Sequence, residues 1–253
     1  MSVSNNIDQF ISETEFSGYQ RIVLPDGKVI PGVDRTPSAD IVFTKNPAGK
    51  SVLDVGCYYG FFLHEAIRRG ALKATGLEPD AARFSIANRL AAEWSRKVEV
   101  FNSSLEAFES SERFDLVLLL NVMHHVSAPL KVMCKLASLC RGTLVVEFRK
   151  LNDPQYVYEC LHEPGQVATK PTKLAARVWR RARFALETRL MERLTRNMPL
   201  VGVASVEYDR SFFFTPLGFR NMFVVHNHLF RDVRFMPSVT PGQMLAFCDC
   251  SDL

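Results

Sequence analysis

The chain has 253 residues, of which 47% are hydrophobic and 23% charged, and its formal net charge is +4. These values fit a globular protein with one sizeable core and exclude a disordered chain. No apolar run approaches the roughly 20 residues that a membrane-spanning helix needs. The first residues, MSVSNNIDQFISETEF, have neither a basic start nor a long apolar stretch, so we expect no secretory signal and a cytoplasmic location.

Six cysteines are scattered along the chain, and none has the spacing of a zinc site. Several lie in apolar stretches, where a reduced thiol packs like a small core side chain. The closest pair, in CDC near the C-terminus, is one residue too tight for C-x-x-C. The sequence therefore predicts no metal site.

The N-terminal part, residues 1–45, is predicted to be a polar arm followed by a hairpin-like lead-in. The lead-in reads YQRIVLPDGKVIPGVDRT, in which Pro-Asp-Gly and Pro-Gly are turn signals between short β-like runs. Residues 46–253 then form the main predicted domain. We expect the lead-in to act as a lid on that domain.

Residues 51–148 alternate short apolar runs with helical segments. Strands are predicted in SVLDVG, KATGLEP, VEVFNSS, FDLVLLLNVM and GTLVVEF, and helices in FFLHEAIRRG, DAARFSIANRLAAEW, LEAFES and PLKVMCKLASLC. This alternation is typical of an α/β fold with a parallel sheet covered by helices on both faces. FDLVLLL and TLVVEF are continuously apolar, as central strands should be.

A basic segment, residues 165–200, is predicted as a helical insertion. Between Lys170 and Arg196 there are nine Lys or Arg against two Glu, a local charge of +7. Apolar residues recur at every fourth position: Leu174, Val178, Ala182, Leu186, Leu190, Leu194 and Met198. Three interpretations stay open: a solvated helix capping the active site, a surface for a phosphate-bearing substrate or RNA, and an interfacial membrane helix anchored by Trp179 and Phe184.

The closing part of the chain is predicted to be a helix followed by a strand pair. The helix lies in TPLGFRNMFVVHN, where Thr215 suits the cap and Pro216 the first helical position. The two strands are LFRDVRFMPS and QMLAFC.

A glycine turn follows the first strand of the predicted parallel sheet, in DVGCYYG. Ligands of such sheets bind outside the carboxyl ends of the strands, and glycine lets a ligand approach the main chain. The dinucleotide fingerprint G-x-G-x-x-G is not met, because Tyr58 replaces its middle glycine and Phe61 begins a bulky helix start. A nicotinamide enzyme is therefore disfavoured.

S-adenosylmethionine (SAM) needs less: an acid before the turn, two glycines, and a second carboxylate after the next strand that holds the ribose hydroxyls. Asp54 and Glu78 stand at these places, and an adenine site is expected in FNSSLEAF. The predicted cofactor-binding residues are Asp54, Gly56, Cys57, Tyr58, Gly60, Glu78, Pro79, Ser104, Leu105 and Asn121. Asp54 as a turn cap and Glu78 as a solvated loop residue are the structural alternatives.

Two histidines follow the strand FDLVLLL. Methyl transfer is an in-line displacement at a sulfonium carbon, so the enzyme mostly positions the nucleophile, and a hydroxyl acceptor also needs a base. His125 or His124 is the candidate base. Glu147, Tyr208 and Arg210 are the candidate substrate contacts. Packing of one histidine, a Glu147–Arg149 pair and a Tyr208–Arg210 surface pair are the alternatives.

These motifs, VLDVGCYYG, GLEPD, NSSLEAF and FDLVLLLNVMHHVSAPL, resemble in their order the class I SAM-dependent methyltransferases. The chain is most similar to the branch related to the tRNA wobble-uridine (carboxymethoxyuridine-type) methyltransferases, whose D-G-x-x-x-P-G-x-D lead-in is matched by DGKVIPGVD, and whose histidine and Pro-Leu are kept as His125 and Pro129-Leu130. The resemblance implies a Rossmann-like fold with a mostly parallel seven-stranded sheet, and an N-terminal lid over SAM bound by Gly56, Gly60 and Glu78.

The expected function is SAM-dependent O-methylation of a small molecule, a sugar, or a phosphate-bearing glycan or nucleotide-linked substrate. Methylation of a modified tRNA wobble uridine is the alternative, with RNA as partner. A SAM- or nucleotide-binding scaffold without catalysis is the alternative from another class. The basic segment, residues 170–196, adds peripheral contact with the inner face of the membrane as a further option.

Overall fold

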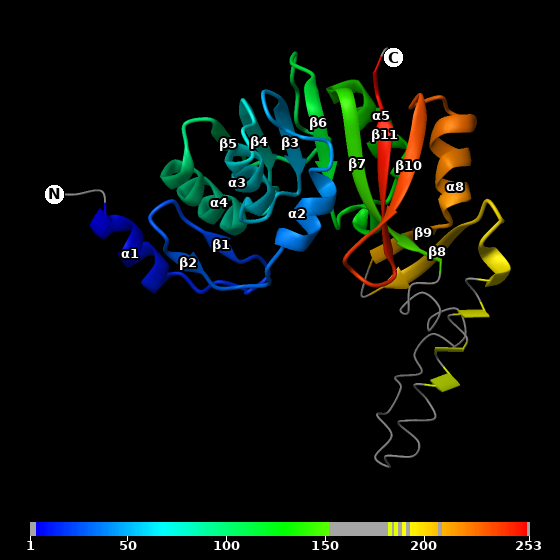
Figure 1. The fold of residues 1–253 in the computed structure, drawn as a ribbon, viewed down its shortest axis with the longest axis horizontal. Coiled ribbons are helices and arrows are strands. Elements are labelled where there is room, and N and C mark those ends of the chain that lie inside the picture. The colour runs from blue at the N-terminus through cyan, green and yellow to red at the C-terminus, as the bar shows by residue number, and fades with distance from the viewer. Residues whose placement is uncertain are drawn as a thin grey trace. The chain divides into compact units, whose positions relative to one another are not determined.

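A computed structural model describes residues 4–151, 182–183, 185–186, 189–190, 193–206 and 209–251 of the chain (Figure 1). These residues form two compact units, which divide after Ser104. Each unit has its own strands and helices. The predicted division into residues 1–45 and 46–253 remains a prediction.

The first unit carries three parallel strands flanked by helices. Its elements are α1 (Ser4–Glu13), β1 (Ile22–Val23), β2 (Val29–Ile30), α2 (Thr36–Val42), β3 (Ser51–Val55), α3 (Phe61–Arg68), β4 (Lys73–Leu77), α4 (Ala81–Trp94) and β5 (Val98–Phe101). β4 pairs with both β3 and β5 in parallel, and β1 and β2 form a separate antiparallel ribbon (Figure 1). The strands and helices predicted between residues 51 and 101, and the hairpin-like lead-in, are confirmed.

Two helices of this unit were not expected from the sequence. The polar arm contains α1, in which Ile7 is buried and the ring of Phe10 packs edge-on against Phe16, with centroids 6.1 Å apart. The apolar spacing that makes this helix amphipathic is short and lies among polar residues, which obscures it in the sequence. α2 begins at Thr36 and buries Ala39 and Val42.

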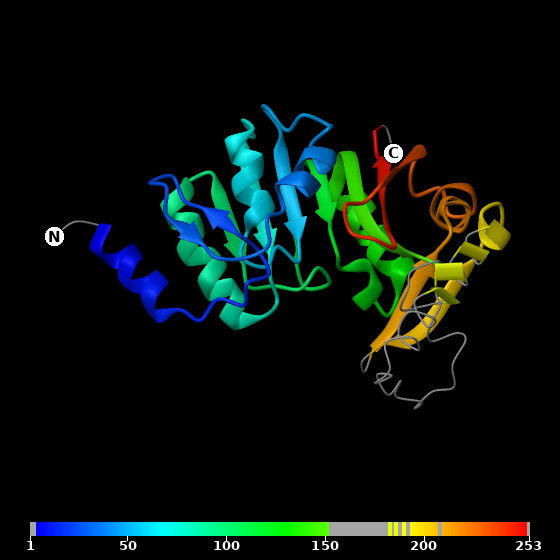
Figure 2. The same cartoon turned by 60° about the horizontal axis from the view of Figure 1, so that its bottom comes forward.

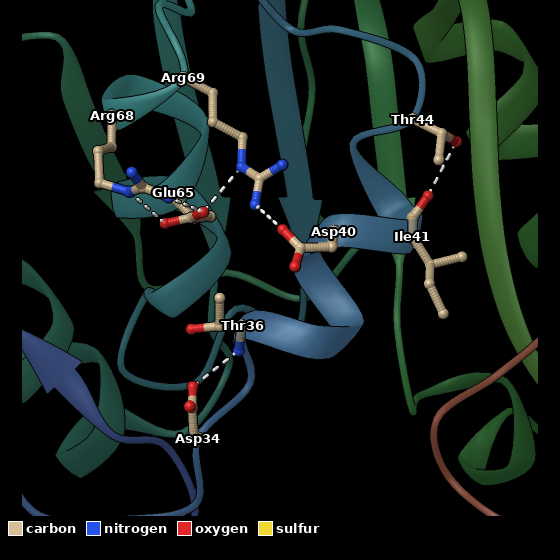
Figure 3. A network of polar contacts seen from close by, with 8 residues as sticks. All are labelled: Asp34, Thr36, Asp40, Ile41, Thr44, Glu65, Arg68 and Arg69. Carbon is tan, nitrogen blue, oxygen red and sulfur yellow. Dashed lines mark hydrogen bonds and ion pairs between the residues drawn. The ribbon is translucent and has the colours of Figure 1, made fainter.

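Charged side chains fix α3 against α2 (Figure 3). The Glu65 carboxylate accepts hydrogen bonds from Arg68 and Arg69, and the Arg69 guanidinium also reaches Asp40 of α2. Burial alone raises the pKa of Glu65, but the hydrogen bonds and charges of the two arginines outweigh it and hold the pKa below its usual value. The helix that follows the glycine turn therefore keeps one orientation relative to its neighbour.

His64 of α3 is buried, and neither of its ring nitrogens has a hydrogen-bond partner among the residues that the structure describes. Its ring stacks on Trp94, with centroids 4.8 Å apart. Burial lowers its pKa from 6.5 to about 3. The folded protein therefore carries a neutral His64 at every pH above about 3, whereas the unfolded chain takes up a proton below about 6.5.

We expect this histidine to make the fold acid-sensitive. Because the unfolded state binds the extra proton, the free energy of unfolding falls as the pH drops below 6.5, by about 2 kcal/mol at about pH 5 if only His64 contributes. Urea unfolding of the wild type and of His64→Phe at about pH 7.5 and 5 measures the effect. The variant should lose less stability on acidification, while His226→Ala, at an exposed histidine, should follow the wild type. Equal pH slopes for His64→Phe and the wild type would contradict it.

The second unit carries the remaining strands. Its elements are β6 (Phe114–Leu119), η1 (Met123–His125), α5 (Pro129–Leu139), β7 (Cys140–Lys150), β8 (Val201–Val206), β9 (Asp209–Phe214), α8 (Pro216–Arg220), η2 (Asn221–Val225), β10 (Asp232–Pro237) and β11 (Gln243–Asp249). β7 pairs with β6 in parallel and with β11 antiparallel, and β10 pairs with β11. β8 and β9 form a hairpin (Figure 2), and in the described part of the chain β9 joins the end of β7 through two residue pairs.

All seven strands expected from the sequence are present, as β3 to β7, β10 and β11. The cap at Thr215 is also confirmed, because its hydroxyl accepts a hydrogen bond from the Gly218 amide at 3.0 Å. The short helix expected in LEAFES is wrong, since residues 105–107 form a turn. The β8–β9 hairpin was not predicted. Among the described helices, none is both long and apolar enough to cross a membrane.

Candidate functional site

The glycine turn between β3 and α3, residues 56–60, contains three residues in the left-handed region. Gly56, Tyr58 and Gly60 have φ angles of 76°, 57° and 87°. The amides of Gly56 and Cys57 both donate to the Leu77 carbonyl, at 2.8 and 3.0 Å, so the turn is closed over the end of β4. Left-handed backbone costs about 1 kcal/mol or more for a residue with a side chain such as Tyr58, and such strain concentrates at functional sites.

The Glu78 carboxylate holds this turn. It is buried, and its two oxygens accept hydrogen bonds from the amides of Tyr58 at 3.0 Å and Asp80 at 3.1 Å. Burial raises its pKa, although these two amides lower it. Asp80 in turn caps α4 by accepting from the Arg83 amide. The structure thus brings Glu78 to the turn between Gly56 and Gly60, as the order of the strands predicts.

Asp54 is a second buried acid at the same place. Its side chain is 2% exposed, and its Oδ2 atom has no hydrogen-bond partner among the described residues. Burial, followed by the nearby charge of Glu78, raises its pKa to about 7. Asp54 therefore does not cap the turn through Oδ2. The positive charge of Arg83 lowers the pKa of Glu78 but does not cancel the effect of burial, so the pair of acids still favours a cation near the ends of β3 and β4.

The loop after β5 contacts the backbone of Glu78. The Asn102 side chain donates to the carbonyls of Glu78 and Pro79, at 2.9 and 3.1 Å. Ser103 donates to the Ser104 carbonyl at 3.0 Å. Asn102 was not singled out from the sequence, although it begins the predicted adenine loop. Leu105, which begins the second unit, is buried.

The lead-in packs onto the glycine turn. Buried Gln20 accepts from the amides of Tyr59 at 3.2 Å and Phe61 at 3.4 Å, and its amide group donates to the Cys57 carbonyl at 3.5 Å. Gly32 lies against the backbone of Gln20, since a Cβ atom there would come within 2.5 Å of the Gln20 carbonyl. The glycine of the Pro-Gly pair therefore allows this part of the lead-in to pack closely against the backbone of Gln20. Gln20 itself was missed, and the only signal for it was its place in the lead-in.

The Gln20→Leu substitution should loosen the turn. Two buried amides, of Tyr59 and Phe61, would lose their acceptor, which costs about 1–3 kcal/mol. Urea unfolding measures the loss of stability, and calorimetry with S-adenosylhomocysteine (SAH) measures the accompanying loss of affinity. Gln9→Leu, at an exposed position of α1, is the matched control and should change stability by less than about 0.5 kcal/mol. Wild-type stability and SAH affinity in Gln20→Leu would refute the role of Gln20.

In the second unit, the residues after β6 form a polar group. Asn121 has a φ angle of 57° and accepts from the Gln243 side chain at 3.2 Å. His124 is buried and His125 exposed, with ring centroids 4.0 Å apart. Burial, then the charges of Arg149 and His125, lowers the pKa of His124 to about 3. His124 is therefore neutral at every physiological pH.

The structure describes only two of the three candidate substrate contacts, Glu147 and Arg210. Glu147 is nine-tenths buried and accepts a hydrogen bond from Ser238, which holds it in place. Arg210 lies in β9, and Tyr208 lies outside the described residues. Most of the basic segment, residues 165–200, also lies outside them.

Gln243 is a polar group that the sequence did not reveal. It begins β11, is 8% exposed, and pairs in register with Arg149 of β7. Its Oε1 atom is buried without a hydrogen-bond partner in the described part of the chain. A predicted strand gave no reason to single out one glutamine at its first position.

Comparison of the sequence with known protein families assigns the chain to one of them. A family model described as a methyltransferase domain matches residues 32–220. The chain belongs to this family. The match includes the glycine turn, Glu78 and both histidines, and thus contains the motifs on which the resemblance was based.

Individual relatives match over shorter stretches. A tRNA U34 carboxymethyltransferase of Dichelobacter nodosus is 34% identical over 114 residues, which are 44% of this chain and 36% of that protein. A ubiquinone biosynthesis O-methyltransferase of Vibrio vulnificus is 33% identical over 106 residues, 41% of this chain and 45% of that protein. These matches thus span between a third and a half of the length of the relatives. Neither relative fixes the substrate of this chain.

Solved structures match over more of the chain. The N-terminal domain of EvdMO1, crystallised in the presence of SAH and D-fucose, has a TM-score of 0.61 at 14% identity, covering 98% of this chain and 97% of that one. The 1,6-didemethyltoxoflavin-N1-methyltransferase of Burkholderia thailandensis, with bound SAH, has a TM-score of 0.54 at 13% identity, covering 85% and 77%. SAH is what SAM becomes on methyl transfer. The predictions of a Rossmann-like fold and of a methyltransferase domain are therefore confirmed.

Proposed function

We propose that the protein transfers a methyl group from SAM to an oxygen atom of a small molecule or sugar. The observation that carries this proposal is the pair of buried acids, Asp54 and Glu78, beside a left-handed turn. SAM bears a sulfonium and an ammonium group, which are favoured by the negative charge of Glu78 and, above about pH 7, also by that of Asp54. The pyrophosphate of a dinucleotide would instead be repelled, which agrees with the absence of the third glycine.

The residues present fit the cofactor. When bound, SAM supplies an electrophilic methyl group on a positively charged sulfur. Glu78 has the acceptor oxygens that a ribose diol needs, and the unpartnered Oδ2 of Asp54 suits a cationic or hydrogen-donating group. We propose as cofactor contacts Asp54, Gly56, Cys57, Tyr58, Gly60, Glu78, Pro79, Ser104, Leu105 and Asn121.

The acceptor chemistry rests on the two histidines. A general base works best when its pKa lies near the working pH, and a pKa of about 3 makes His124 a poor proton acceptor. We therefore propose exposed His125 as the base that takes the proton of the acceptor hydroxyl, with His124 packing beside it. Glu147, Tyr208 and Arg210 are the proposed acceptor contacts. The relative named as a ubiquinone biosynthesis O-methyltransferase supports an oxygen acceptor.

A modified tRNA wobble uridine is the second candidate acceptor. It is favoured by the two relatives named tRNA U34 carboxymethyltransferase, which are 29% and 34% identical to this chain over parts of its length. The basic segment, residues 170–196, would suit the phosphates of RNA.

One experiment separates these candidates. The purified protein is incubated with isotope-labelled SAM and either the small-molecule or the RNA fraction of a cell extract, and mass spectrometry identifies what gains the label. We expect label in the small-molecule fraction. Label only in RNA would select the second candidate, and SAH binding without transfer to any fraction would select a non-catalytic scaffold. Calorimetry that detects no binding of SAM or SAH would overturn the proposal as a whole.

A further inference from the structure

Exposed apolar side chains gather in one stretch of the second unit, residues 186–203. Among the described residues, seven of the fifteen large hydrophobic side chains that are exposed lie there: Leu186, Leu190, Leu194, Met198, Leu200, Val201 and Val203. The three leucines Leu186, Leu190 and Leu194 are 68%, 54% and 58% exposed. Large exposed apolar groups that cluster mark a contact surface, whereas scattered ones are ordinary.

Leu186, Leu190 and Leu194 recur at every fourth position, and each lies in a described helical stretch. The described residues 185–186, 189–190 and 193–195 are helical, and side chains four positions apart lie above one another on a helix. Three exposed arginines lie close to these leucines in the sequence: Arg189, Arg193 and Arg196. On a helix, Arg189 and Arg193 would be about 100° from the leucines that follow them. An aliphatic stripe bordered by arginines is typical of a helix that lies in a membrane interface.

The end of this stripe is fixed to the body of the unit. The Thr215 hydroxyl donates to the Met198 carbonyl at 2.6 Å and accepts from the Leu200 amide at 3.0 Å. Val201 and Val203 then continue as exposed side chains of β8, with buried Gly202 between them. The anchoring means that the apolar side chains are displayed from a defined place in the fold.

A cavity of about 180 Å³ opens at the same end of the stripe. It is lined by Lys150, Leu151, Thr195, Arg196, Phe214, Thr215, Pro216 and Met244. Among the described residues that line it, the two charged side chains, Lys150 and Arg196, are both cationic. Its apolar residues include Phe214, which is fully buried. The cavity thus offers two cations beside an apolar wall, which suits an anionic group attached to a hydrocarbon.

We propose that the seven exposed apolar side chains described between positions 186 and 203 dock onto an anionic phospholipid surface, with the leucines in the lipid and a headgroup phosphate at Lys150 and Arg196. RNA is a poorer match, because the exposed apolar side chains of this stretch are aliphatic and bases stack on aromatic rings. A second copy of the chain is also a poorer match, since it would bring two rows of arginines together. This surface does not depend on the methyl acceptor.

Vesicle flotation tests the proposal with the full-length chain. We expect binding to vesicles of phosphatidylcholine with phosphatidylglycerol, and much weaker binding to phosphatidylcholine alone. The triple variant Leu186→Glu/Leu190→Glu/Leu194→Glu should bind at least about tenfold more weakly, since each leucine contributes more than a factor of ten when buried. Leu72→Glu, at a leucine 63% exposed in the first unit, is the control and should bind like the wild type. Arg189→Glu/Arg193→Glu should lose the preference for the anionic vesicles.

Other results would overturn the proposal. These are unchanged vesicle binding by the triple leucine variant, equal binding to neutral and anionic vesicles, and dimerisation in light scattering that the leucine variant abolishes. Micromolar binding of inorganic phosphate in calorimetry without any vesicle binding would assign the cavity to a soluble phosphate compound instead. The triple leucine variant should keep the SAH affinity and the melting temperature of the wild type. A loss of vesicle binding then reports a change in the surface and not unfolding.

Discussion

Glu78→Ala should weaken SAH binding by about 100-fold, or about 2.7 kcal/mol. The carboxylate is the proposed acceptor for both ribose hydroxyls, and it also holds the Tyr58 amide of the turn at 3.0 Å. Glu78→Gln keeps one oxygen acceptor but places an amide NH2 against a backbone N–H, so its affinity should lie between those of Glu78→Ala and the wild type. Isothermal titration calorimetry with SAH measures all three affinities.

The matched control for this series is Glu99→Gln. Glu99 lies on β5 of the same unit, is half exposed and pairs with Lys73, so its substitution should leave SAH affinity unchanged. Circular dichroism melting separates loss of binding from loss of fold. The hypothesis that Glu78 binds the ribose would be falsified if a folded Glu78→Ala protein bound SAH as tightly as the wild type.

The pH dependence of SAH binding follows from the same residue. Burial raises the pKa of Glu78, so the folded protein holds a proton there at a higher pH than an ordinary glutamate. The protonated acid accepts hydrogen bonds less well. SAH affinity should therefore decline on acidification, and the decline should be smaller in Glu78→Gln, where only Asp54 of the two acids still takes up a proton.

The contact between Glu78 and the glycine turn was predictable because it depends on the order of the strands. A parallel sheet places successive strand ends at one edge, so a turn after β3 and an acid after β4 must meet. The contact of Glu78 with the Tyr58 amide, across 20 residues, is the result of that rule. The glycines could be found because their positive φ angles exclude most other residues.

The contacts of the lead-in could not be found in the same way. Gln20 reaches the Tyr59 amide across 39 residues, and no periodicity in the sequence specifies which polar side chain of the lead-in turns inward. The Asn121–Gln243 hydrogen bond spans 122 residues and joins the end of β6 to β11. Such contacts depend on the packing of distant elements, which composition and spacing do not encode.

The β8–β9 hairpin was missed for a related reason. Its strands contain β-branched and aromatic residues, but the sequence between them, in VGVASVEYDRSFFF, has no Asn-Gly or Asp-Gly turn of the kind that signals a hairpin. Its attachment to β7 is two residue pairs long in the described part of the chain. The hairpin therefore depends on tertiary packing, as in the contact of Phe148 with Phe214, whose ring centroids lie 5.9 Å apart.

His125→Ala should lower the rate of methyl transfer by about 100- to 10 000-fold, the range expected for loss of a general base. SAH affinity should stay at the wild-type value, since the substitution removes a group that acts on the acceptor. The measurement is transfer of labelled methyl from SAM to the acceptor fraction identified in the extract experiment. His226→Ala, at another exposed histidine of the second unit, is the control and should keep the wild-type rate.

The two adjacent histidines can be distinguished by their response to pH. His124 is neutral above about pH 3, so its protonation does not reduce the rate between about pH 5 and 8. A fall in rate on acidification through that range, if it disappears in His125→Ala and persists in His124→Asn, identifies His125 as the titrating base. A His125→Ala protein that transfers methyl groups at the wild-type rate would show instead that the acceptor loses its proton without a histidine. The acceptor would then carry a nucleophile that is already deprotonated or needs no base, such as a carboxylate oxygen.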